Sequence, residues 1–113
     1  MDLLYSWTKL TDKQQKKMDK AEIKVPFVLD FGLRQVCVVK LEDGFHAVSN
    51  ICPHAGVQLH RGSCSKKGIL ICPAHGYKFD VHNGRSADGN GYVLKTFRIK
   101  EEAGAYFVGM RRF

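Results

Sequence analysis

The chain has 113 residues, of which 44% are hydrophobic, 11% aromatic and 26% charged. This balance predicts one small globular domain spanning 1–113 and excludes an intrinsically disordered chain. The net charge of +7 and the pI of about 9.4 are those of many nucleic-acid-binding proteins. The basic residues, however, are spread along the chain without a basic tail, so we expect no nucleic-acid partner.

The apolar runs, such as residues 36–39, are far too short to cross a bilayer. Residues 1–5 also lack the cationic and apolar segments of a secretory signal. We therefore expect a cytoplasmic protein without a membrane partner. The sequence does not predict its oligomeric state.

The pattern of the first 30 residues predicts two strands joined by a short polar connection. Residues 5–10, with Trp7, predict the first strand. Residues 11–20 form a Lys-rich connection with about one helical turn. Ile23, Val25 and Phe27 then alternate with polar residues or proline, which predicts a half-buried strand.

The rest of the chain predicts further strands separated by turns. Residues 34–41 are β-branched and apolar, and Asp43-Gly44 predicts a two-residue hairpin turn into 45–49. Further strands are expected at 68–71, 79–81, 97–99 and 106–110. Because helical periodicity is nearly absent, we expect an all-β fold, an antiparallel sandwich or barrel.

Two short Cys-His segments stand out, Cys52-Pro53-His54 and Cys72-Pro73-Ala74-His75. Two thiolates and two imidazoles suit either zinc or an iron–sulfur cluster. Structural zinc sites usually pair two Cys in one arm with two His in the other. Here each arm carries one of each, which favours a dinuclear centre with both thiolates on one iron and both imidazoles on the other.

The residues around these segments resemble the Rieske ferredoxin pattern. They comprise Asn50 to Gly56 with Leu59 and Gly62, followed by Cys72 to Asp80 and Gly84. The resemblance implies one Rieske-type 2Fe-2S cluster, in a Rieske-like antiparallel β-sandwich or barrel whose small cluster-binding subdomain spans about 50–80. It also implies that Cys52 and Cys72 bind the inner iron, while His54 and His75 bind the outer, solvent-facing iron.

The remaining cysteines and histidines carry weaker signals. Cys37 lies in an apolar run and is expected in the core, whereas Cys64 lies in a polar loop and reads as an incidental thiol. His46, His60 and His82 lack paired ligand spacing and are expected at the surface. The sequence shows no further His/His/carboxylate set for a mononuclear iron, so an oxygenase in its own right is not expected.

The resemblance implies a one-electron carrier without catalytic residues of its own. Its expected partners are a flavoprotein reductase and a terminal oxygenase or similar acceptor. Two alternatives remain open: the small subunit of a multi-component oxidoreductase such as NADH-dependent nitrite reductase, and a zinc-stabilised interaction module.

Two further expectations concern the surroundings of the cluster. High-potential members of the family carry Ser and Tyr where this chain has Tyr77 and Phe79, so we expect a potential near the low end of the range of about −150 to +300 mV. Basic residues between 52 and 85 are expected to form a positive rim around the imidazoles and to attract acidic partners. These residues are Arg61, Lys66, Lys67, Lys78 and Arg85.

Overall fold

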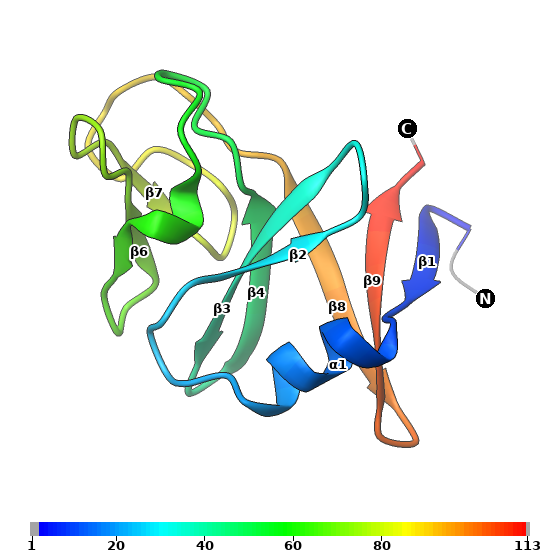
Figure 1. The fold of residues 1–113 in the computed structure, drawn as a ribbon. Coiled ribbons are helices and arrows are strands. Elements are labelled where there is room, and N and C mark those ends of the chain that lie inside the picture. The colour runs from blue at the N-terminus through cyan, green and yellow to red at the C-terminus, as the bar shows by residue number, and fades with distance from the viewer. Residues whose placement is uncertain (1–2, 113) are drawn as a thin grey trace.

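The computed structural model describes residues 3–112, which form two antiparallel sheets, one α-helix and the short 3-10 helix η1 (Leu59–Arg61) (Figure 1). The larger sheet has six strands in the order β1-β9-β8-β4-β3-β2. Its strands are β1 (Tyr5–Lys9), β2 (Phe27–Asp30), β3 (Gln35–Leu41), β4 (Gly44–Ser49), β8 (Thr96–Glu102) and β9 (Ala105–Arg111). The smaller sheet, in the order β5-β6-β7, comprises β5 (Ser63–Cys64), β6 (Ile69–Ile71) and β7 (Lys78–Asp80). The expected all-β class with antiparallel strands is confirmed.

Strand β3 is buried on both faces because it lies between two hydrophobic cores. Its residues Cys37, Val39 and Leu41 pack into a core shared with the small sheet. The intervening Val36 and Val38 face a second core inside the six-stranded sheet. Alternation along a strand places successive side chains on opposite faces. The uninterrupted apolar run thus couples the two sheets, and Cys37 is a fully buried core residue as expected.

Helix α1 (Asp12–Asp19) spans the gap between edge strand β2 and strand β9 (Figure 1). Thr11 begins the helix with a capping box, in which its side chain accepts a hydrogen bond from the Gln14 N–H and the Gln14 side chain accepts one from the Thr11 N–H. The Gln14 side chain also donates to the Asp30 carbonyl on β2, and the Tyr106 N–H on β9 donates to the side chain of Gln15. Buried Met18 packs into the second core. The helix is longer than the single turn expected from the sequence.

The expected strand at Ile23, Val25 and Phe27 is wrong in its first half. Ile23 makes only an isolated bridge to Lys40, and its side chain and that of Val25 are exposed. Strand β2 begins only at Phe27, after Pro26, and pairs with β3. The alternation therefore reflects a chain that runs along the protein surface before it joins the sheet edge.

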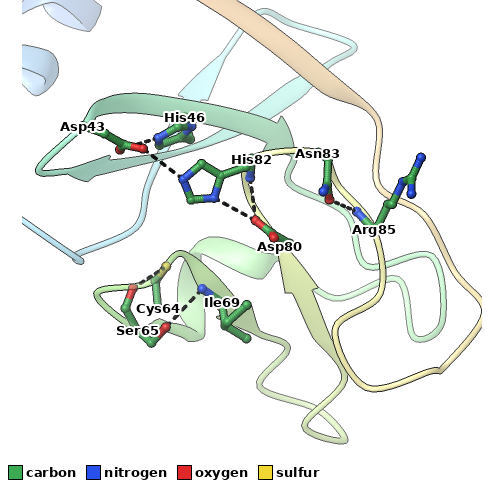
Figure 2. Close-up of polar contacts among 9 residues, drawn as sticks. All are labelled: Asp43, His46, Cys64, Ser65, Ile69, Asp80, His82, Asn83 and Arg85. Atoms are coloured by element: carbon green, nitrogen blue, oxygen red, sulfur yellow. Dashed lines mark hydrogen bonds and ion pairs between the residues drawn. The ribbon is translucent and has the colours of Figure 1, made fainter.

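The hairpin between β3 and β4 turns one residue earlier than expected. Leu41 pairs with Gly44, so Glu42 and Asp43 form the two-residue turn. Gly44 follows with φ +125°, a value that side-chain-bearing residues rarely adopt. The Asp43 side chain of this turn contacts His82, which lies two residues after β7 (Figure 2).

Among residues 3–112, no helix is long and apolar enough to cross a membrane.

Candidate metal centre

Two loops with the same backbone hydrogen bonds carry the Cys-His segments. In the first loop, Gly56 N donates to Cys52 O, and Cys52 N donates to Val57 O. In the second loop, Gly76 N donates to Cys72 O, and Cys72 N donates to Tyr77 O. The spacing from each Cys is identical in both loops, so two segments of different sequence fold into one local shape.

Each loop closes through a glycine with positive φ. Gly56 has φ +71° and Gly76 has φ +75°, and a Cβ at either position would meet open space. These glycines are required for backbone conformation rather than for close approach. Gly62 is different, because a Cβ there would lie 2.0 Å from the Ile71 carbonyl oxygen. It allows the chain that follows the first loop to pass against the second.

The structure brings all four of the expected ligand side chains together at the end of the small sheet. Cys52 and Cys72 are each 1% exposed, and each lies near enough to the other for Cys52 to raise the pKa of the Cys72 thiol. The His54 and His75 rings lie 4.9 Å apart, with His75 exposed and His54 half-buried. Two sulfurs therefore lie inside and two imidazoles lie toward solvent.

The Nδ1 atom of His54 is buried and lacks a hydrogen-bond partner among the described residues. A buried polar atom without a partner is costly, and native proteins rarely leave one unsatisfied. A metal bound to this nitrogen would remove that cost. The two thiols, the two imidazoles and the unpaired nitrogen together fit the expected iron–sulfur cluster.

The Cys72 sulfur is surrounded by groups that bear on its charge. Burial raises the pKa of the Cys72 thiol and the adjacent Cys52 raises it further, while hydrogen bonds from the backbone N–H groups of Ala74 and His75 lower it. N–H groups directed at a ligand sulfur also stabilise added negative charge. The second loop thus provides both the thiol and the donors that tune it.

A buried amide network holds the first loop in place, and sequence reasoning missed it. Asn50 is fully buried, and its side chain donates to the Gln35 side chain and accepts the His60 backbone N–H. The His60 ring also contacts the Asn50 amide at 2.9 Å. Burial lowers the pKa of His60, as do Arg61 and Lys17. His60 is therefore a half-buried part of this network, and its place between the two ligand segments was the available signal.

Two tyrosines cover the His54 imidazole. The Tyr77 ring stacks on it at 4.0 Å and 24°, and the Tyr92 ring lies 6.0 Å away. Tyr92 comes from the segment after β7, where Asp88 accepts hydrogen bonds from Ser86 and Asn90. Nothing in the sequence connects that Gly-rich segment to the Cys-His loops.

The expected basic rim is only partly present. Lys66 and Lys67 lie in the turn before β6, whereas Cys72 follows β6, so the length of this strand separates them from the Cys-His loops (Figure 1). Arg85 lies level with Asp80 at the far end of β7, because its carbonyl accepts the Asp80 N–H. Arg61 and Lys78 remain near the loops.

His46 and His82 form part of an unexpected cluster at the opposite end of β7 from the second Cys-His segment. Both rings contact the carboxylate of Asp43 (Figure 2). The structure therefore brings together a His/His/carboxylate set that the sequence did not indicate. Side-chain contact between the hairpin turn and the segment after β7 brings these residues together, and no sequence spacing reveals it.

Cys64 is also less incidental than expected, because it is half-buried on β5 and packs against the first core. Burial raises its pKa to about 11, and burial raises that of Cys37 to about 12. Both thiols are therefore poor nucleophiles at neutral pH.

Comparisons with known proteins agree with this site. Residues 6–98 match the Rieske [2Fe-2S] domain family. The chain is 39% identical over 82 residues to the ferredoxin component of the alkene monooxygenase system of Xanthobacter autotrophicus, covering 73% of this chain and 67% of the relative.

Two solved structures share the fold. A protein described as the small subunit of an NADH-dependent nitrite reductase from Mycobacterium tuberculosis superposes with a TM-score of 0.78 at 21% identity, over 97% of this chain and 99% of that one. A chain from the complex of reduced oxygenase and oxidized ferredoxin in carbazole 1,9a-dioxygenase superposes with a TM-score of 0.71 at 23% identity, over 79% and 92%. The chain belongs to the Rieske [2Fe-2S] domain family and is an electron carrier with a Rieske-type 2Fe-2S cluster.

Proposed function

We propose that Cys52 and Cys72 bind the inner iron of the cluster and that His54 and His75 bind the outer iron. The unpaired Nδ1 of His54 carries this assignment, since a buried imidazole nitrogen beside two buried thiols suits a metal ligand. The residues of the small sheet and its loops, about 50–80, would then form a cluster-binding subdomain within one domain of 1–113.

The chain's own residues would determine where electrons enter and leave. When bound, the cluster supplies a one-electron redox centre. The thiol side is closed by the first core, which includes Leu59, Leu70 and Phe79. The exposed His75 edge faces solvent. A partner would therefore dock at the imidazole end, against His54, His75 and the neighbouring Tyr92.

We further propose that the chain accepts electrons from a flavoprotein reductase and passes them to a terminal oxygenase. The relative from Xanthobacter is the ferredoxin component of a monooxygenase system, and the carbazole structure is a complex of an oxygenase with a ferredoxin. Both proteins are described as ferredoxins that belong with an oxygenase, which supports an oxygenase as the acceptor.

A second candidate role is that of a small subunit in a larger oxidoreductase. The superposition with the protein described as a nitrite reductase small subunit covers nearly all of both chains. The two roles predict different behaviour during purification. A free carrier would purify alone, whereas a subunit would purify with a large redox chain.

We also propose a cytoplasmic location. Cys37 and Cys64, the two cysteines outside the proposed ligand set, form no disulfide. Unpaired thiols suit a reducing compartment.

Electron delivery provides the test of the proposed role. The reduced protein would be mixed with an isolated oxygenase component in a stopped-flow instrument, and reoxidation of the cluster would be followed by absorbance. We expect rapid reoxidation that depends on oxygenase concentration. Reoxidation at the same slow rate with and without the oxygenase would contradict the role as an oxygenase donor.

A further inference from the structure

A second cluster of metal-binding side chains lies where the two sheets meet. Asp43 and His46 come from the β3–β4 hairpin, and Asp80 and His82 come from the end of β7 and the turn after it (Figure 2). Asp43 and His82 are 39 residues apart in the sequence. The first core contains Cys52 and Cys72 but none of these four residues.

The ligand atoms of this cluster converge on one point. His46 Nε2 lies 2.7 Å from Asp43 Oδ1, and His82 Nε2 lies 3.0 Å from Asp43 Oδ2. One ligand atom from each of the three residues lies within 4.8 Å of the others. Ligands at zinc bond lengths of about 2.0–2.2 Å in a tetrahedron are roughly 3.3 Å apart, so small side-chain movements would accommodate an ion.

Asp80 holds the His82 ring in the orientation that directs its Nε2 atom toward Asp43. Its Oδ1 atom lies 2.8 Å from His82 Nδ1 and also accepts the His82 backbone N–H at 2.9 Å. A carboxylate that accepts the Nδ1 proton of a metal-binding histidine fixes the tautomer and leaves Nε2 as the ligand. Here Nε2 is the atom that faces Asp43.

We propose that Asp43, His46 and His82 bind a divalent transition-metal ion of the zinc class, with Asp80 as a positioning residue. Two imidazoles and one carboxylate suit zinc, and three protein ligands leave a fourth position for water. The His46 side chain is 19% exposed, that of His82 39% and that of Asp43 57%, so the ion can reach the site from solvent.

Protons compete with the ion at this site. Both ring nitrogens of His82 face carboxylates, and the hydrogen bonds to Asp80 and then to Asp43 raise its pKa. The cation must displace the proton on Nε2, so its affinity falls as the pH falls. Lys66 and Lys67 line the same hollow as Asp43 and His82 and moderate the attraction for a cation.

The ion would link the hairpin of the large sheet to the small sheet. Such a link stabilises the folded arrangement, because the unfolded chain does not hold these ligands together. Zinc should therefore raise the unfolding temperature as well as bind.

The experiment titrates zinc chloride into the cluster-loaded protein at pH 7.5 and measures binding by isothermal titration calorimetry. In the loaded protein, the proposed ligands His54 and His75 are occupied, so they do not compete for zinc. We expect one zinc ion per chain, and about 100-fold weaker binding for His82→Gln or Asp43→Asn. Asp80→Asn should weaken binding about 10- to 100-fold, the range typical of residues that orient a ligand.

Glu42→Gln is the matched control, since it removes the same charge from the same turn. It should leave the affinity unchanged. His46→Gln supplies a second ligand variant if another fails to fold, and the visible spectrum of the cluster reports folding in each case. Absence of zinc binding by the unsubstituted protein, or binding that survives loss of Asp43 and of a histidine, would overturn the proposal.

Discussion

The Tyr77 ring lies flat on the His54 imidazole, with centroids 4.0 Å apart. Phe79, two residues further, is completely buried in the first core. Tyr77 therefore covers the imidazole with its ring, and Phe79 has no hydroxyl to donate to a sulfur. We expect a potential below about +100 mV and little change in Tyr77→Phe, because only the ring is needed for stacking. Protein-film voltammetry gives both values, and a potential above about +100 mV would refute this interpretation.

Substitution of the proposed ligands should have different effects at the thiolate-bound iron and at the imidazole-bound iron. Cys52→Ala or Cys72→Ala should abolish the cluster, since each thiolate holds the inner iron. His54→Cys should retain a cluster at a lower potential, because an added thiolate makes the centre more negative. Visible absorption and electron paramagnetic resonance distinguish these outcomes. A stable cluster in either Cys variant would show that the assignment is wrong.

The loop glycines should control the cluster beyond their effect on stability. Gly56→Ala and Gly76→Ala place a side chain at positive φ, which should cost about 1–2 kcal/mol each. Gly32→Ala is a matched control, because Gly32 has φ +83° and open space in a turn away from the loops. Chemical denaturation should show similar losses for all three. Only the loop variants should also speed cluster loss; equal rates in all three would argue against a specific role for the loops.

Charge near the imidazole end should affect docking in a position-dependent way. Arg61→Glu and Lys78→Glu should slow association with an acidic partner about tenfold at low salt, with a smaller effect at 0.15 M, where the Debye length is about 8 Å. The double variant Lys66→Glu and Lys67→Glu is the control, since β6 separates these two residues from the Cys-His loops. Stopped-flow measurements give the association rates of these variants. A larger decrease for the Lys66 and Lys67 double variant would show that the partner docks away from the imidazole end.

The His82 contacts should make stability depend on pH. The pKa of His82 is raised above 6.5 by its hydrogen bonds to Asp80 and Asp43, so this stabilisation is complete below about pH 6.5 and is lost as the pH rises through the folded value. The pKa of Asp43 is lowered from 3.8, chiefly by its hydrogen bonds to His46 and His82, so the contribution of Asp43 is lost in acid. With a chelator present, the unfolding temperature of the unsubstituted protein should exceed that of His82→Gln most below about pH 6.5, and this difference should shrink as the pH rises. A constant difference from pH 5 to 9 would contradict this.

The sequence predicted the Rieske family and its 2Fe-2S cluster because the information for both is local. Each Cys-His segment lies within a single loop, so its spacing indicates a metal site, and the residues around it carry the family resemblance. Most strands were also predictable, since β3 and β9 have continuous or alternating apolar residues. Features that depend on strand pairing were not predictable. Two such features are the contact between Asp43 and His82 and the separation of Lys66 from the Cys-His loops. Both follow from how the sheets pack, and no local sequence pattern contains that information.

The measurement that tests the central claim most directly is the iron, acid-labile sulfide and zinc content of the purified chain. We predict two iron and two sulfide per chain, because a 2Fe-2S cluster contains them in that ratio. Zinc found in addition would reflect the Asp43 site. Neither iron nor sulfide, with about one zinc per chain that His82→Gln retains, would contradict the account and would identify the Cys-His loops as a zinc site.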